Sequence, residues 1–97
     1  ISIINAKLSR TVAANMGSPR LNYRTGRFAS SVLVTDVRST PQGYPSIGYT
    51  YMKGPYQTFE PGFAQGSVQR DPRKLIDFSI REIAAELAIG RFYTRRV

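Results

Sequence analysis

The chain has 97 residues, with 14 Lys plus Arg against 6 Asp plus Glu and with no Cys, His or Trp. A chain of this length buries roughly 60 to 65 % of its unfolded surface, which allows one modest core and favours oligomerisation as a further source of stability. The missing residue types exclude a disulfide framework, a thiolate nucleophile, an imidazole base and a zinc site built from Cys or His. No stretch approaches the ~20 apolar residues of a membrane span, so we expect no membrane partner.

The net charge of +8 is concentrated at the two ends of the chain. The first 30 residues carry five cations and no acid, and the last seven add Arg91, Arg95 and Arg96, whereas the residues between are balanced. Because the termini of compact domains often lie close together, we expect the two ends to form one basic region. An ordinary solvated surface is the alternative interpretation.

The first predicted element is a helix from about Ser2 to Met16. Ile4, Leu8 and Val12 recur at helical spacing, and Gly17 supplies a C-terminal stop. This spacing predicts one apolar stripe that packs against the rest of the domain.

A β-hairpin is predicted next. Ser31–Val37 is dominated by β-branched residues, and Ile47, Tyr49 and Tyr51 alternate with small or polar residues in a second strand. Residues 39–43 between them have the composition of a turn, so antiparallel pairing is the simplest arrangement.

Pro and Gly punctuate the segment that follows the hairpin. We expect a short helical turn at Pro55–Glu60 and a flexible loop at residues 61–70.

The final predicted helix begins at Asp71 and ends near Gly90. Asp71 suits the N-cap, Pro72 the first helical position, and Gly90 the left-handed cap. Its predicted apolar face consists of Ile76, Ile80, Ile83, Ala84 and Leu87.

On the surface of this helix, Arg73 and Arg81 each lie four residues from Asp77, the spacing of helix-surface ion pairs. Residues 91–97 are expected to follow as a basic C-terminal tail. Together the elements predict an α+β fold in a single domain spanning residues 1–97, with two longer helices packed on a small antiparallel β-sheet.

Candidate catalytic groups are few. Four of the six carboxylates lie on the final helix or its cap, where capping and pairing account for them. Glu82 and Glu86 share a helix face that could hold a divalent ion, but without a third acid nearby a solvated pair is favoured. Phosphate-binding loops of the GxxxxGKS/T or GxGxxG type are missing. We therefore expect no catalytic residue, no metal and no cofactor.

Arginine and aromatic residues interleave at both basic ends, a pattern that suits phosphate contact and base stacking. The residues are Arg20, Tyr23, Arg24, Arg27 and Phe28, and then Arg91, Phe92, Tyr93, Arg95 and Arg96. The same spacings suit burial of the rings, and no RNP, KH or zinc-finger pattern is present. A small basic nucleic-acid-binding protein is therefore the alternative function.

Three segments resemble the tail-completion and minor tail proteins of long-tailed bacteriophages. Residues 22–32 are similar to the Thr-Gly-Arg-Leu/Phe signature of that family running into a strand. Residues 47–49 and 54–62 resemble its second strand and its Pro-Tyr-x-x-Phe-x-Glu-x-Gly segment, and residues 70–72 open a helix where the family has its terminal helix. The resemblance covers roughly residues 5–89, although Arg24 stands where the family usually has an acid.

The resemblance implies a non-enzymatic virion structural protein of the head-to-tail connection or tail, present in the host cytoplasm during assembly. It implies a homo-oligomeric ring, six- or twelve-fold, around the DNA channel, with other head, connector or tail proteins as partners. The expected subunit-interface residues are Arg24, Thr25, Gly26, Arg27, Tyr56, Phe59 and Phe63. Contact with DNA in the channel, or with acidic partner surfaces, is expected of Arg20, Arg91, Arg95 and Arg96.

The signature also has a physical interpretation of its own. Thr25 can cap a short turn in which Gly26 allows close backbone approach. Arg27 then projects toward a carboxylate such as Glu60 or toward a neighbouring subunit. A local turn cap with an exposed Arg27 is the alternative.

Overall fold

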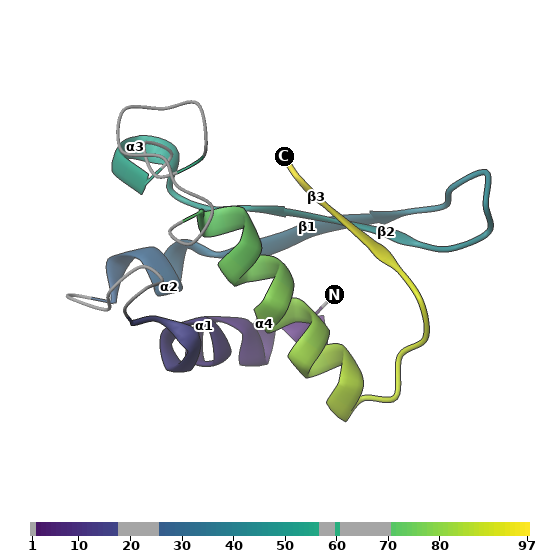
Figure 1. Ribbon diagram of the computed structural model, residues 1–97, viewed down its shortest axis with the longest axis horizontal. Coiled ribbons are helices and arrows are strands. Elements are labelled where there is room, and N and C mark those ends of the chain that lie inside the picture. Colours follow the sequence, from purple (N-terminus) through teal and green to yellow (C-terminus); the bar gives the residue numbers. More distant parts are fainter. Residues whose placement is uncertain (1, 18–25, 57–59, 61–70) are drawn as a thin grey trace.

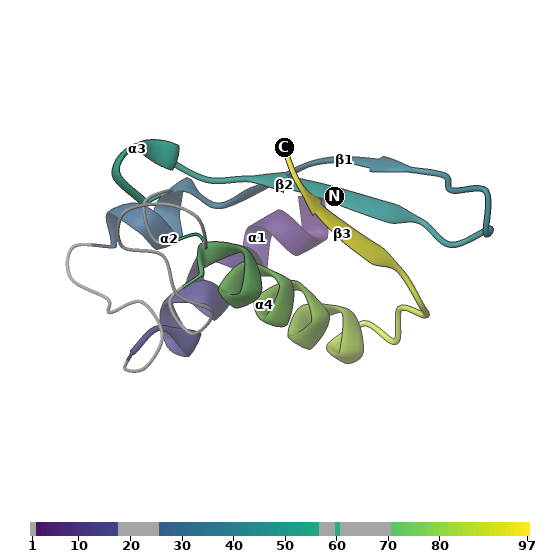
Figure 2. The same ribbon diagram turned by 45° about the horizontal axis from the view of Figure 1, so that its top comes forward.

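The structure, a computed structural model, describes residues 2–17, 26–56, 60 and 71–97. Its two longer helices are α1 (Ser2–Asn15) and α4 (Pro72–Glu86), and its short ones are α2 (Arg27–Ser31) and α3 (Lys53–Tyr56). Strands β1 (Leu33–Arg38), β2 (Ser46–Thr50) and β3 (Tyr93–Arg96) form one sheet in the order β1-β2-β3. Helices α1 and α4 lie on the same side of this sheet (Figures 1 and 2). The predicted α+β class is therefore confirmed.

The predicted hairpin is confirmed as the antiparallel pair of β1 and β2. Val34 faces Tyr49 and Val37 faces Ile47, with a register shift between Val34 and Asp36. In the connecting turn Gly43 has a φ of 86° and donates its N–H to Thr40 O at 2.9 Å. A side chain at this left-handed position would be strained, which explains the glycine.

The third strand was not expected, and it makes the sheet mixed instead of antiparallel. Residues expected as a basic tail form β3, which pairs in parallel with β2 so that Arg95 faces Gly48 and Arg96 faces Tyr49. Because charged and polar residues occupy both faces of this strand, it has none of the apolar alternation from which the other strands were predicted.

Helix α1 is attached to the free edge of β1 by one side chain. Asn5 donates its amide N–H to Val34 O at 3.1 Å, and its side-chain oxygen accepts the Val34 N–H at 2.8 Å. The amide thus pairs with backbone groups that point away from β2, and it blocks that part of the edge against other strands.

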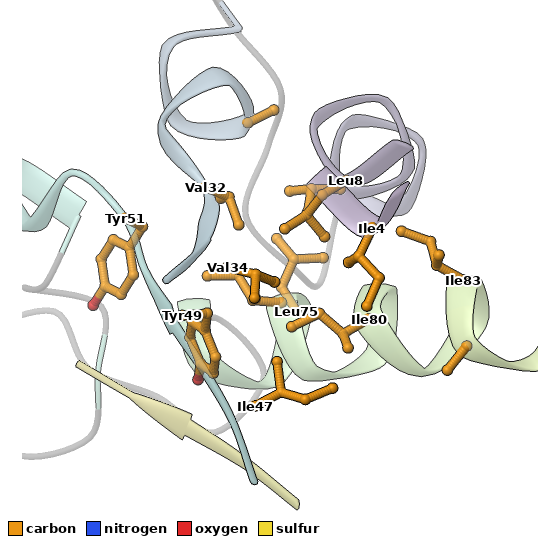
Figure 3. Close-up of a cluster of buried hydrophobic side chains, with 14 of the residues drawn as sticks. Ile4, Leu8, Val32, Val34, Ile47, Tyr49, Tyr51, Leu75, Ile80 and Ile83 are labelled. Atoms are coloured by element: carbon orange, nitrogen blue, oxygen red, sulfur yellow. The ribbon is translucent and has the colours of Figure 1, made fainter. Parts of the chain in front are cut away.

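The hydrophobic core lies between the two longer helices and the inner face of the sheet. Figure 3 shows side chains from α1, α4, β1 and β2 converging there. Its fully or nearly fully buried members include Ile4, Leu8, Val12, Val34, Ile47, Tyr49, Leu75, Ile76, Ile80 and Ile83. The predicted stripe of α1 is confirmed, as is that of α4 except at its end, where Leu87 is exposed.

Helix α4 begins as predicted and ends earlier than predicted. Asp71 is the N-cap and accepts the Arg73 N–H at 3.0 Å, with Pro72 in the first turn. At the other end the left-handed residue is Ala88, with a φ of 57°, and the expected cap at Gly90 is wrong. The backbone N–H of Ile89 bonds Ala84 O and that of Ala88 bonds Ala85 O, so the chain already reverses two residues before the glycine.

Two other boundaries also differ from expectation. Ser31 belongs to α2, so the first strand begins at Leu33. The helical turn expected at Pro55–Glu60 begins earlier, as α3, while residues 57–59 and the expected flexible loop at 61–70 lie outside the described residues. None of the helices in the described ranges is long and apolar enough to cross a lipid bilayer.

Candidate functional site

The first candidate surface lies at the end of the sheet where β2 leads into α3, and it combines two of the segments that carry the family resemblance. Gly26 has a φ of 78° and precedes α2, and its carbonyl accepts the Ser30 N–H at 2.9 Å. Exposed Arg27 follows, with its guanidinium carbon 5.9 Å from the centre of the Tyr56 ring. We call Arg27 and Tyr56 the α2–α3 surface.

Aromatic packing beneath this surface joins the two segments. The Phe28 ring is buried and lies 4.9 Å from that of Tyr56, edge to face, and 5.6 Å from that of Tyr51. Contacts of this kind contribute about 0.5–1.5 kcal/mol beyond the buried area. Tyr56 is therefore fixed by the core while Arg27 remains exposed. The other expected interface residues, Arg24, Thr25, Phe59 and Phe63, lie outside the described residues.

Glu60 is a buried charge, with only 1 % of its surface exposed. Its Oε2 accepts a hydrogen bond from the Tyr51 hydroxyl and lies 3.0 Å from Arg96 Nε, and Arg73 Nε lies 3.7 Å from its Oε1. The Arg96 contact is an attraction between charges without an aligned N–H bond. Of the two partners expected for Arg27, Glu60 is thus paired with Arg96 and Arg73 instead, and a neighbouring subunit stays a prediction.

The buried cluster around Glu60 changes proton affinities nearby. Burial, and then the hydrogen bond to Glu60, raise the pKa of Tyr51 above its ordinary value. On the α4 side, the side-chain hydrogen bonds from Arg73 to Asp71 raise the pKa of Arg73. Arg73 is paired with Asp71 and Glu60, so its expected pair with Asp77 is wrong, while the Arg81–Asp77 pair is confirmed at 3.0 Å.

The Arg95 side chain lies on the face of the sheet that points away from α1 and α4. Its Nη2 donates to Asp36 Oδ1 at 2.7 Å and its Nε donates to Ser46 Oγ at 2.9 Å. A Cβ on Gly48 would lie 2.1 Å from Asp36 Oδ1 and 2.6 Å from Arg95 Nη1. The ion pair therefore occupies the space that a side chain at position 48 would need.

Burial and neighbouring charges act on the pKa of Asp36 in opposite directions. Its partial burial opposes ionisation, but the hydrogen bond and charge of Arg95, together with the charge of Arg38, hold the pKa of Asp36 below its ordinary value.

The second candidate surface lies at the opposite end of β2, where the hairpin turn enters the strand. The guanidinium carbon of exposed Arg91 is 5.1 Å from the centre of the Tyr44 ring, which in turn lies 6.2 Å from the Tyr93 ring, edge to face. We call these three residues the hairpin surface. Five strand residues, about 17 Å, separate the two surfaces.

The structure thus separates the arginines that the sequence analysis grouped together. Arg95 and Arg96 are held in ion pairs within the fold, Arg91 belongs to the hairpin surface, and Arg20 lies outside the described residues. The Glu60 cluster was missed in sequence reasoning because its partners are distant along the chain. Its only sequence signal was the glutamate of the Pro-Tyr-x-x-Phe-x-Glu-x-Gly segment.

Acidic groups in the described ranges form no cluster of three that could hold a metal ion. Glu82 accepts a hydrogen bond from Asn15 Nδ2 at 2.9 Å, and Glu86 Oε2 lies 3.8 Å from Lys7 Nζ. Both acids of the pair considered for a divalent ion therefore connect α4 to α1.

Comparison with known proteins now identifies the family. The family model for the bacteriophage T5 tail completion protein p143 matches residues 4–95, nearly the whole chain. The chain belongs to the T5 tail completion protein p143 family. The resemblance to tail-completion proteins stated from sequence is therefore confirmed.

One member of this family is the tail completion protein p143 of Escherichia phage T5. It is 36% identical to the chain over 90 residues, in an alignment that covers 78% of the chain and 35% of the relative. The chain thus spans about a third of the length of that p143 protein. No solved structure matches the chain significantly.

Proposed function

We propose that this chain is a non-enzymatic structural component of a bacteriophage tail or head-to-tail connection, and that copies of it form a closed ring around the DNA channel. The observation that carries the proposal is the match to the tail completion protein p143 family over residues 4–95. Location in the virion, and in the host cytoplasm during assembly, follows from the same role.

The two surfaces support ring formation. A closed ring with cyclic symmetry above two-fold needs two different surfaces on each subunit, because every contact is head to tail. The α2–α3 surface and the hairpin surface lie at opposite ends of β2, and each presents an arginine on a tyrosine ring. Arg and Tyr are enriched at protein interfaces. The Tyr56 ring, which packs against the core, loses little entropy on binding.

In this proposal Gly26, Arg27 and Tyr56 contact the neighbouring subunit, together with Arg24, Thr25, Phe59 and Phe63. Of the arginines expected at the channel, Arg91 is the exposed one among the described residues, and it contacts DNA or an acidic partner. Since Arg95 and Arg96 are paired with Asp36 and Glu60, their contribution to binding phosphate is reduced.

Electron microscopy of negatively stained particles and mass photometry test the ring directly. We expect closed rings in the images, and masses that are one fixed multiple of the monomer mass. Arg27→Ala removes the exposed side chain that the α2–α3 surface presents and should shift the population toward monomers. Arg10→Ala, the same change at an exposed site on α1, is the matched control and should leave the rings intact.

The alternative function, a small basic nucleic-acid-binding protein, has a different signature. A protein that makes about five phosphate contacts would bind DNA more weakly as the salt concentration rises. A plot of log affinity against log salt concentration would have a slope near −4.5. A monomer with that slope and no rings at any protein concentration would refute the proposal.

A further inference from the structure

A basic groove separates α4 from β3. It is open to solvent, has a volume of about 760 Å³ and is lined by five Lys or Arg residues against two Asp residues. Lys74 and Arg81 project from the α4 side, where Phe78 is 46 % exposed. Four of these cations are paired with Asp71, Asp77, Asp36 and Glu60, which leaves one positive charge in excess and favours an acidic occupant over a basic one.

The groove runs along a strand edge that the described part of the chain leaves unpaired. The sheet order ends at β3, and the N–H groups of Tyr93 and Val97 bond Pro45 O and Tyr49 O at 2.9 and 2.8 Å. Backbone groups alternate in direction along a strand, so those of Thr94 and Arg96 point away from β2. An extended segment can bond to these groups as a further strand.

Side chains of β3 alternate in the same way. Thr94 and Arg96 are on the α4 side, in contact with Asp77 and Glu60. Tyr93 and Val97 are on the other side, with the side chain of Arg95 paired to Asp36 between them, and are 41 % and 50 % exposed. A strand added here would therefore have alternate residues beside the basic groove and beside two exposed apolar side chains.

We propose that the groove between α4 and β3 binds an extended acidic segment of a partner protein, which adds to the sheet beside β3. The favoured sequence alternates acids, which face Lys74 and Arg81, with β-branched or aromatic residues, which pack on Tyr93 and Val97. Tyr93 also belongs to the hairpin surface, but Lys74, Arg81 and the backbone edge of β3 lie outside both ring surfaces, so the two proposals can fail separately.

Two other occupants fit less well. A second copy of the chain has only six acids, which are scattered and provide no run of alternating acids. A nucleic acid strand lacks the alternating amide donors and carbonyl acceptors that match a strand edge.

Fluorescence anisotropy with a labelled peptide, Glu-Val-Glu-Val-Glu-Val-Glu, tests the charge preference. We expect saturable binding to the unaltered chain and none of the matching Lys-Val peptide. The double variant Lys74→Glu and Arg81→Glu should weaken binding about tenfold or more, as expected for reversal of two surface charges. The double variant Arg10→Glu and Lys53→Glu, with the same charge change at exposed sites elsewhere, should bind within about twofold of the unaltered chain.

Strand addition is tested at Thr94. Thr94→Pro removes an N–H that points toward the groove and keeps those that bond β2, whereas Thr94→Val removes only the hydroxyl. We expect Thr94→Pro to bind the peptide about tenfold more weakly than Thr94→Val does. In the unaltered chain, amide hydrogen exchange at Thr94 and Arg96 should slow when the peptide is added, a measurement that needs no variant to fold.

The proposal is overturned if exchange at these two amides does not change at saturating peptide. It is also overturned if oligothymidylate of equal charge binds as tightly and competes for the groove, because the site would then be a phosphate-binding surface. Equal loss of binding in both charge-reversed double variants would show that net charge, and not the groove, attracts the peptide.

Discussion

Glu60→Gln tests the part of the fold that most depends on tertiary contacts. The substitution keeps the size of the side chain and removes its charge. Glu60 is 1 % exposed, with Arg96 at 3.0 Å, Arg73 at 3.7 Å and the Tyr51 hydroxyl as partners. Neutralising it leaves two arginines without their shared counter-charge and leaves the hydrogen bond to Tyr51 without its charge assistance.

The magnitude follows from the burial of each partner. Removing one member of a fully buried ion pair costs about 3–5 kcal/mol of unfolding free energy. The side chains of Arg96 and Arg73 are 25% and 40% exposed, so water compensates them in part. We therefore expect a loss of about 2–3 kcal/mol, or a melting temperature lower by about 10 to 20 °C for a domain of this size.

Urea denaturation followed by circular dichroism measures the loss. Glu86→Gln is the matched control, because the Glu86 side chain is 64% exposed and its Oε2 lies 3.8 Å from Lys7 Nζ. An exposed pair of this kind contributes about 0–1 kcal/mol. If Arg96→Gln is added to Glu60→Gln, the combined loss should be smaller than the sum of the single losses, since the second change removes the unpaired cation.

Two results would refute this reasoning. Equal stability of the Glu60→Gln and Glu86→Gln chains would mean that Glu60 is hydrated in solution. Strict additivity of Glu60→Gln and Arg96→Gln would mean that the two charges do not interact.

Three further predictions concern the rest of the domain. Ala88→Gly should raise the unfolding free energy by about 0.5–1 kcal/mol in urea, because Ala88 has a φ of 57°; an unchanged midpoint would contradict this. Ile80→Ala should lower it by about 2–5 kcal/mol, because Ile80 is fully buried, and a melting temperature close to that of the parent would place Ile80 outside the core. The pKa values of Tyr49 and Tyr51 are raised, first by burial and then by Asp77 in the case of Tyr49 and by Glu60 in the case of Tyr51. The stability that these two tyrosines contribute is therefore present below pH 10 and is lost as the pH rises above it. In an absorbance titration Tyr49 and Tyr51 should ionise after the other tyrosines, at the pH at which the chain unfolds. Ionisation of all six tyrosines while the chain is still folded would contradict this prediction.

Local sequence determined the two longer helices and the hairpin. The stripe of Ile4, Leu8 and Val12 and the N-cap at Asp71 depend on residues within one or two helical turns, so spacing and residue type suffice to predict them. The protein family could also be predicted from the sequence, because the short motifs that mark it are contiguous in the chain.

Tertiary structure alone decided the third strand and the pairing of the charges. Strand β3 exists because β2 lies beside it, and Arg95 finds Asp36 across 59 residues of sequence. The same holds for Glu60, whose neighbours in sequence give no indication that Arg96 would neutralise it. Periodicity describes which face of an element is apolar, but which charge meets which depends on how distant segments are brought together. For this reason the C-terminal arginines, which sequence alone could describe only as a basic end, divide into Arg95 and Arg96 within the fold and Arg91 on its surface.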